Sequence, residues 1–377
     1  MKKSNVILIS WIKVSLFGGE LDLPQEGDFS IALQEAEEQK ILALVSDSIQ
    51  SDDIMQMVLQ TKAYYMKIVY EQSHLVDLYN NSNIPLIILK GTSAAMYYPK
   101  PYLRAMGDVD FVVPYEKFDE ARSVMETNGY AFRRDFGDDR DYEYIKNDVV
   151  LELHHHFSKD PVVEKYVQDG IKISVTGCVT GNLFPCLPPA ENGLMILDHI
   201  RHHFKSSGLG LRHLIDWMMY AHSVLNDEFW NEKFQPMVRS AGLERFAMVL
   251  TATCRKWLGL PEDYSWCKGV DDDLMDQTIE LFLANGNFGR KQDRDRNRVE
   301  KVSANLKSEV SFRGLQSTGE RTWKALEKYP WLRPFAWIYQ CCRFAKKGII
   351  YIFSNKNIMN ELSDGLAKGE YYRNIGL

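Results

Sequence analysis

Apolar positions along the chain follow two different spacings. Over Ile31–Val45 and Asp52–Leu78 they recur every three or four residues, as Ile54, Met57 and Val58 do, which predicts helices. Between residues 84 and 154 the apolar runs are short and rich in β-branched residues, which is typical of strands. After Pro188-Pro189 the helical spacing returns. The pattern predicts an α+β protein with a helical segment over 1–80, a mixed core over 81–187 and a larger helical domain over 188–377.

The mixed core begins with a strand, a turn and a short helix. Ile84–Leu89 reads as a buried strand, and Lys90-Gly91-Thr92-Ser93 breaks it and opens the helix. A second strand is expected over Asp108–Val113. Because residues two apart on a strand share a face, Asp108 and Asp110 leave on one side and the apolar residues between them on the other.

Two adjacent carboxylates on one strand face repel each other, and a divalent cation between them removes that cost. Val149–His154 reads as a further strand, in which Glu152 is the one acidic residue. A buried carboxylate without a partner is costly, so we expect Glu152 beside the Asp pair. Asp108, Asp110 and Glu152 would then hold two Mg²⁺ ions, with Mn²⁺ as a substitute. The alternative is that the Asp residues cap turns and Glu152 forms a salt bridge.

The remaining expected elements of the core follow in order. A helix should run from Pro114 to Thr127, and short strands should cover Tyr130–Arg134 and Tyr142–Lys146. In the C-terminal half, helices are expected over 190–205, 211–225, 227–258 and 272–284, and over 320–351 with breaks at Pro330 and Pro334. Residues 285–298 are charged and contain glycine, which predicts an exposed loop.

The turn after the first strand has the composition of a phosphate-binding turn. Gly91 permits close backbone approach, Thr92 and Ser93 supply hydroxyl donors, and Lys90 could add a charge to the β- or γ-phosphate. The hydroxyl residues could equally be an ordinary helix cap. Arg104 could clamp a phosphate with two hydrogen bonds or hold its own loop by a backbone carbonyl.

The stretch Leu89-Lys90-Gly91, Tyr98-Pro99, Arg104 and Gly107–Asp110 resembles the poorly characterised bacterial nucleotidyltransferases that carry "LKG…YP…R…DID". These belong to the DNA polymerase beta-like superfamily. Leu151–His154 is similar to the family's third-carboxylate strand, and His199–Trp217 to its helical segment. The resemblance covers about residues 60 to 345. Thr92 departs from it, since the superfamily usually has Ser or Gly there.

The resemblance implies a polymerase-beta-like core that moves a nucleoside monophosphate from an NTP to a hydroxyl and releases pyrophosphate. A small molecule is the expected acceptor. A protein- or RNA-modifying enzyme is one alternative, and a non-catalytic nucleotide-binding module is another. In the resemblance Lys205, Arg212 and Asp216 lie in a helical segment that closes over the nucleotide, although each could form a surface salt bridge.

Histidines gather at 154–156 and at 199, 202, 203 and 213. His199 and His203 stand four apart on a predicted helix, a spacing that zinc sites use. However, Ile200 occupies the place of the glutamate that a zinc protease would need. His154 is therefore expected to contact substrate or to hold Glu152.

The composition limits which binding partners and which cellular compartment we expect for this protein. The net charge is −6, and a stable complex with nucleic acid needs clustered cations, so none is expected. Six cysteines without metal or disulfide spacing fit free thiols in the cytoplasm. No apolar run is long enough for a transmembrane segment. Met1–Phe17 weakly resembles a signal peptide, but we favour a helix that packs against the rest of the protein.

The C-terminal run Arg321–Lys356 has the opposite charge from the rest of the chain. It holds eight Lys or Arg residues against one acid, Glu327, with aromatic residues interleaved. Such helices can lie on an anionic membrane or bind a partner protein or nucleic acid. The alternative is that the aromatic residues pack inward as a structural core.

Overall fold

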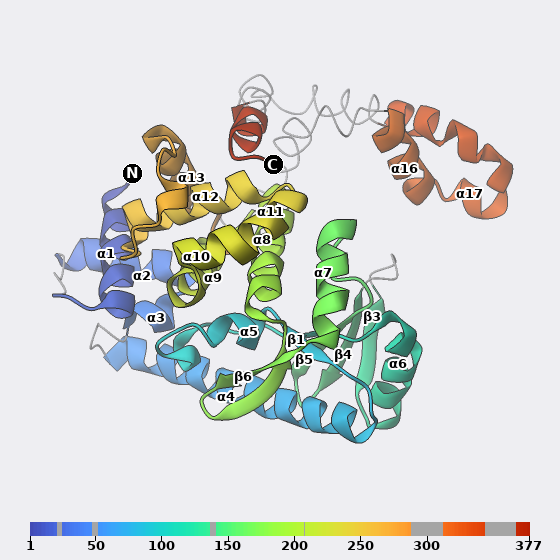
Figure 1. The fold of residues 1–377 in the computed structure, drawn as a ribbon, viewed down its shortest axis with the longest axis horizontal. Helices are drawn as coiled ribbons and strands as arrows, with labels where there is room; N and C mark the ends of the chain where they lie inside the picture. The colour runs from blue at the N-terminus through green and yellow to red at the C-terminus, as the bar shows by residue number, and fades with distance from the viewer. Residues whose placement is uncertain (21–24, 47–51, 136–140, 207, 288–311, 344–366) are drawn as a thin grey trace. The chain divides into compact units, whose positions relative to one another are not determined.

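The computed structural model describes residues 1–20, 25–46, 52–135, 141–206, 208–287, 312–343 and 367–377 (Figure 1). The chain forms two compact units: Met1–Lys291 with Gly376–Leu377, and Gln292–Ile375. The predicted domain boundaries near residues 80 and 187 both fall inside the first unit, where they stay a prediction.

The N-terminal segment is helical, as predicted. Its helices are α1 (Lys3–Phe17), α2 (Glu26–Glu38), α3 (Leu42–Ser46) and α4 (Asp52–Asn81). In α1 the side chains of Leu8, Trp11 and Ile12 are fully buried, as expected for a helix packed on the body. Because these apolar residues lie about one helical turn apart, they share one face of α1, and burial of that face packs α1 against the neighbouring helices.

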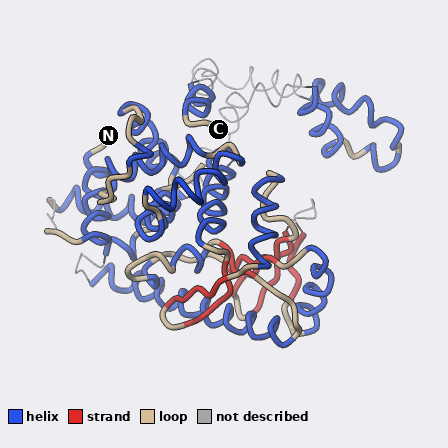
Figure 2. The backbone as a smooth tube through the Cα atoms, in the orientation of Figure 1, coloured by secondary structure: helices blue, strands red, loops and turns tan. Residues whose placement is uncertain are grey.

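Five strands form a mixed sheet in the order β1-β2-β5-β4-β3. Figure 2 shows the strands in red, with helices around them. They are β1 (Ile87–Leu89), β2 (Val109–Val112), β3 (Ala131–Asp135), β4 (Asp141–Lys146) and β5 (Val149–His154). β2 and β5 run parallel, and the other neighbours pair antiparallel. The predicted α+β fold class is confirmed.

One face of the sheet is apolar and packs against α4. Val109 and Phe111 of β2 belong to a single core with Ile68 and Tyr79 of α4, and the rings of Tyr79 and Phe111 lie 5.5 Å apart. Burying a side chain such as Phe111 contributes about 1.5–3 kcal/mol. Because strand side chains alternate, this packing turns the other face of β2 away from the core.

Further helical elements complete the first unit. In the sheet region they are α5 (Gly91–Ala95), α6 (Phe118–Thr127), α7 (Pro161–Lys172) and 3₁₀ turns at Pro101–Leu103 and Tyr115–Lys117. After residue 188 they are α8 (Pro189–Ser206), α9 (Leu211–Val224), α10 (Asp227–Phe229), α11 (Gln235–Ser240), α12 (Glu244–Thr253), α13 (Asp272–Asn285), π-helical turns at Trp230–Phe234 and Cys254–Leu258, and a 3₁₀ turn at Ser265–Cys267.

The continuous helix expected over 227–258 is wrong, because the chain turns between α11 and α12. Gly242 takes a left-handed conformation (φ 65°), and the Leu243 N–H bonds back to the Val238 carbonyl at 2.7 Å. This is a helix-ending arrangement that suits glycine. The helix expected from Pro114 begins instead as a 3₁₀ turn before α6.

A hairpin of β6 (Val175–Val179) and β7 (Asn182–Cys186) has no counterpart among the predicted elements. Its turn uses Thr180 and Gly181, both at positive φ (47° and 83°). Two such residues match the twist of a two-residue hairpin. The usual Asn-Gly or Asp-Gly signal is missing, so the sequence did not reveal the turn.

In the second unit the structure describes α16 (Phe312–Thr322), α17 (Ala325–Lys328), a 3₁₀ turn at Pro330–Phe335, and helical residues at 336–343 and 367–374. The predicted break at Pro330 is confirmed. Trp323 stacks on Tyr339 at 4.9 Å, whereas Trp331 is 70% exposed. Residues 344–356 of the basic aromatic run, and most of the loop expected over 285–298, lie outside the described residues.

Two further predictions can be compared with the structure. All six cysteines are free thiols. Among the helices that the structure describes, none is long and apolar enough to cross a bilayer.

Candidate active site

Asp110 and Glu152 stand opposite each other on the parallel strands β2 and β5. Both lie on the face away from the core, as the alternation predicted. Asp108 precedes β2 by one residue and lines the same cavity. The pairing of β2 with β5 thus brings together two residues that are 42 positions apart in sequence. The parallel register places them directly opposite each other.

The cavity has a volume of about 190 Å³. The carboxylates form one wall, and the Lys90 turn, the loop before β2 and helices α5, α8 and α9 supply the rest. Its lining residues are Lys90, Gly91, Ala94, Arg104, Gly107, Asp108, Asp110, Glu152, Met195, Ile196, His199, Ile200, His203, Arg212, His213 and Asp216.

Lys90 connects the turn after β1 to the carboxylates. Its Nζ donates to Asp110 Oδ1 at 2.7 Å and lies 3.3 Å from Nε2 of His154. Its backbone has φ 47° and ψ −117°, a conformation that L-residues rarely adopt. Such a residue costs about 1–3 kcal/mol, and strain of this kind gathers at functional sites.

His154 holds Asp110 from the other side. Its Nε2 lies 2.9 Å from Asp110 Oδ1 and 3.7 Å from Glu152 Oε2, while its Nδ1 bonds to Asp141 on β4. Burial acts to lower the pKa of His154, but the hydrogen bonds to Asp110 and Asp141 raise it to about 9. His154 is therefore a positively charged support for Asp110. The sequence suggests Glu152 as its partner, but Glu152 is the more distant of the two carboxylates, at 3.7 Å.

Burial and neighbouring charge separate the pKa values of the three carboxyl groups. Burial first, then the Asp110 carboxylate, raises the pKa of Asp108 to about 6 and that of Glu152 to about 8. For Asp110 burial acts the same way, but Lys90 and His154 outweigh it and hold the pKa below its usual range. Asp108 and Glu152 thus have too little nearby positive charge, and a bound cation would supply it.

The donor set fits a divalent cation. Among the described residues, Asp110, Glu152 and His154 form the group whose ligand atoms all lie within 4.8 Å of one another. Mg²⁺ prefers oxygen ligands, so the two carboxylates are the fitting part of this group and His154 supports them. Asp108 is the further carboxylate on the same cavity wall.

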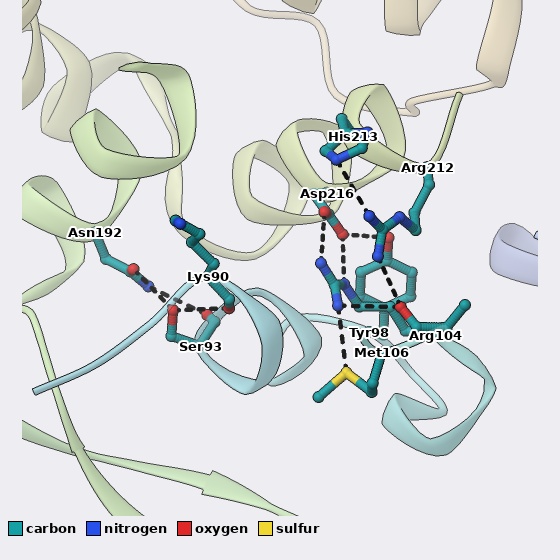
Figure 3. Close-up of polar contacts among 10 residues, drawn as sticks. Lys90, Ser93, Tyr98, Arg104, Met106, Asn192, Arg212, His213 and Asp216 are labelled. Carbon is teal, nitrogen blue, oxygen red and sulfur yellow. Dashed lines mark hydrogen bonds and ion pairs between the residues drawn. The ribbon is translucent and has the colours of Figure 1, made fainter. Parts of the chain in front are cut away.

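Thr92 and Ser93 point away from the cavity. The Thr92 hydroxyl donates to Gln72 of α4. The Ser93 hydroxyl donates to the Lys90 carbonyl at 3.0 Å and to Asn192 of α8 at 3.4 Å (Figure 3). Both side chains are buried. In this structure their hydroxyls fasten the turn, while Gly91 and Lys90 face the cavity.

Arg104 forms a buried two-pronged ion pair with Asp216 of α9. Nε and Nη2 of Arg104 lie 2.7 and 2.8 Å from the two carboxylate oxygens, and the Tyr98 hydroxyl donates to Oδ1 at 2.7 Å (Figure 3). This geometry binds the loop before Asp108 to α9. The sequence left two roles open for Arg104, clamping a phosphate or holding its own loop. The contacts favour the second role, through the Asp216 carboxylate, a partner that the sequence did not indicate.

Arg212 enters the cavity from the first turn of α9. Its Nη1 donates to the Ala105 carbonyl at 3.0 Å, and its Nη2 lies 3.3 Å from Nε2 of His213 (Figure 3). Burial lowers the pKa of the Arg212 guanidinium, and Arg104 adds to that effect. Lys205 is not among the cavity-lining residues, so the structure separates the two cations of the helical segment.

Three histidines line the helical wall of the cavity. The rings of His199 and His203 lie 4.6 Å apart, and those of His199 and His213 lie 5.7 Å apart. Burial lowers the pKa of all three, that of His203 to about 3, so they are neutral. His199 and His203 stand four residues apart on α8, as Ile196 and Ile200 do, whereas His213 lies on α9. The four-residue spacing is the sequence signal that puts the two α8 histidines on one face.

Gln39 fixes the start of α9 from the N-terminal segment. Its side chain is fully buried: Nε2 donates to the carbonyls of Phe282 and Leu283, and Oε1 accepts from the Leu211 N–H at 2.7 Å. Arg212 is the next residue, so Gln39 positions the cation that faces the carboxylates.

Replacing Gln39 by Ala should lower the free energy of unfolding by about 2–3 kcal/mol, because buried backbone groups lose their partners. Urea unfolding of the purified protein measures this. Gln34→Ala is the matched control, since Gln34 is exposed on α2 and bonds only to Glu38 at 3.1 Å in the contacts described. Equal stability of the two variants would contradict the role given to Gln39.

Comparison with known proteins places the sequence in a family. A family model described as an uncharacterised nucleotidyltransferase matches residues 25–259, a range that contains every residue lining the cavity. None of the curated proteins compared with the sequence matches it. Among solved structures, "Crystal Structure of ANT(2")-Ia in complex with adenylyl-2"-tobramycin" is 14% identical, with a TM-score of 0.33. That alignment covers 46% of this chain and 95% of the other.

Proposed function

This chain belongs to the family of uncharacterised nucleotidyltransferases, and on that premise we propose that it transfers a nucleoside monophosphate from an NTP to a hydroxyl group and releases pyrophosphate. The observation that carries the proposal is the pairing of Asp110 with Glu152 on parallel strands, facing a cavity that Lys90 and Arg212 also line. Acids on one wall and Lys90 and Arg212 on the others suit a metal-bound triphosphate.

In this proposal Asp108, Asp110 and Glu152 hold two Mg²⁺ ions, for which Mn²⁺ can substitute. When bound, the metal supplies positive charge that offsets the phosphates and lowers the pKa of the acceptor hydroxyl. The proposed nucleotide site consists of Lys90, Gly91, Thr92, Ser93 and Arg104, which act either on the phosphates or on the turn and loop around them. Lys90 and Gly91 would touch the phosphates, while Thr92, Ser93 and Arg104 hold the turn and loop in place.

The reaction needs a group that takes a proton and groups that neutralise a leaving anion. The acceptor oxygen bonds to the α-phosphorus as the bond from that phosphorus to the bridging oxygen breaks. We assign the hydroxyl proton to Glu152, which faces the cavity beside Asp110, because Asp110 is already held by Lys90 and His154. Lys90 and Arg212, on the facing walls, would neutralise charge on the departing pyrophosphate.

The acceptor in this proposal is a small molecule, because the hydroxyl must reach Glu152 inside a cavity of about 190 Å³. His154 and Lys205 are the further residues proposed to act near the substrate, His154 through Asp110. The free thiols support a cytoplasmic location. Modification of a protein or RNA is the alternative, since a single side chain or terminal hydroxyl could also enter.

Labelled NTPs test the proposal. The protein is incubated with each α-³²P-labelled NTP, Mg²⁺ and a cell lysate, and the products are separated by size. Label in the small-molecule fraction supports the proposed acceptor, and label in protein or RNA supports the alternative. Binding of NTP without transfer of label in any fraction would favour a non-catalytic module and contradict the proposed reaction.

A further inference from the structure

Lys90 occupies the place where a cation would approach Asp110. Its Nζ lies 2.7 Å from Asp110 Oδ1, and His154 Nε2 reaches the same oxygen at 2.9 Å. The side chains of Asp110 and His154 are each only 4% exposed, so this contact is shielded from solvent. Lys90, at 17%, is the more open partner and lines the cavity.

We propose that Lys90 is a resident cation, which holds the Asp110 carboxylate while the metal is absent and moves to the triphosphate when metal and NTP bind. The inference rests on the proposed function, because it requires a metal site at Asp110. It goes further by giving Lys90 two successive partners in one turnover.

Repulsion between cations is the first reason for the exchange. A divalent ion on Asp110 would lie within a few ångströms of the Lys90 ammonium, where like charges shielded from water repel strongly. His154 cannot yield instead, because it is also bonded to Asp141 and its ring is buried. Lys90 has a flexible four-carbon stem and an open side toward the cavity, so it is the group that can move.

The backbone of Lys90 gives the second reason. Lys90 has strained φ and ψ, and its side chain lies over β2, where Nζ bonds to Asp110. Strain that persists in a native structure is maintained by its surroundings, here by the bonds of Ser93 to the Lys90 carbonyl and to Asn192. The anchor of the side chain is thus rigid, and its tip can reach either the carboxylates or a phosphate beside Gly91.

Electrostatic balance gives the third reason. Lys90 and His154 both bond to Asp110, so Asp108 and Glu152, which line the same cavity, are less fully compensated. Once a divalent metal compensates the carboxylates, the lysine is without its carboxylate and the incoming triphosphate is the nearest anion. A permanent salt bridge would leave the metal and the lysine competing for Asp110 throughout the reaction.

The test compares Lys90→Met with Lys67→Met in the full-length protein. Lys67 is the matched control, because it pairs at 3.2 Å with Asp148, whose side chain is 92% exposed. Mn²⁺ affinity without nucleotide is measured from the electron paramagnetic resonance signal of the free ion. We expect Lys90→Met to bind Mn²⁺ about tenfold more tightly than wild type, since a competing cation is removed.

The same proteins are then titrated with a non-hydrolysable NTP analogue at saturating Mn²⁺. Lys90→Met should bind it about tenfold more weakly, because the triphosphate loses a cation. Lys67→Met should match wild type in both measurements. A folded Lys90→Met protein with unchanged or weaker Mn²⁺ affinity, or with unchanged affinity for the analogue, would overturn the exchange.

A second measurement uses the wild-type protein and so does not depend on the folding of a variant. In a crystal structure with Mn²⁺ and the analogue, Lys90 Nζ should contact a phosphate and no longer Asp110. A contact that stays at 2.7 Å with metal bound would overturn the inference. Transfer of label by the wild-type enzyme would still support the proposed function in that case, so the two ideas fail separately.

Discussion

Replacement of Asp110 by Asn should reduce nucleotide transfer by about 10³-fold or more. Asp110 is the carboxylate held ionised by Lys90 and His154, and it faces Glu152 on the neighbouring strand. An amide cannot supply the negative charge that a divalent cation needs, and loss of several kcal/mol of charge stabilisation corresponds to that factor in rate. Initial rates of pyrophosphate release, with the acceptor found in the labelling experiment, measure the effect.

Asp148→Asn is the matched control for this change, because Asp148 lies in the turn between β4 and β5 of the same sheet and its side chain is 92% exposed. It should keep wild-type activity. An Asp110→Asn protein that retains full activity and its fold would contradict the assignment of Asp110 as a metal ligand and with it the two-metal hypothesis.

Asp108→Asn and Asp110→Asn should differ in their effect on stability without metal. The sequence places the two carboxylates on one strand face, which alone predicts that removing either of them relieves their repulsion. The pKa of Asp108 is raised to about 6, so near pH 7 its ionised form destabilises the fold, and Asp108→Asn should raise the unfolding temperature. Asp110→Asn should lower it, because Lys90 and His154 lose their shared partner. Thermal unfolding above pH 7 in the presence of a chelator would reveal both signs.

Asp216→Ala should lower the free energy of unfolding by about 3–5 kcal/mol, the largest stability effect that we expect from a single substitution. Arg104 and Asp216 are only 5% and 7% exposed, and Tyr98 depends on the same carboxylate. Truncating Asp216 leaves a buried guanidinium without compensation, which costs far more than the pair contributes. Urea unfolding at constant ionic strength gives the value.

The double variant Arg104→Met, Asp216→Leu tests the reason for that loss. Removing both charges and keeping an apolar volume should restore much of the stability, since no buried charge remains unpaired. Asp263→Ala is the surface control, because Asp263 pairs with Arg255 and Lys268 while 61% exposed, and it should leave the unfolding temperature unchanged. An Asp216→Ala protein as stable as this control would contradict the structural role of the pair.

The acidic wall of the site could be predicted from the chain because its signals are local. The alternation of Asp108, Val109, Asp110 and Phe111 assigns faces on a strand wherever that strand lies. The lone acid of Val149–His154 indicated a neighbour of the Asp pair, and the register places Glu152 beside Asp110. The resemblance carried by the Lys90-Gly91 turn and the Asp pair is confirmed by the family match over residues 25–259.

The partners of the charged side chains could not be predicted in this way, because they come from elements far apart in sequence. Arg104 meets Asp216, 112 residues later, and His154 meets Asp141 only because β4 pairs with β5. The helix period placed His199 and His203 on one face but did not say which cavity that face would line. Periodicity depends on the geometry of one element, whereas these contacts depend on how several elements pack, and so they became visible only in the folded chain.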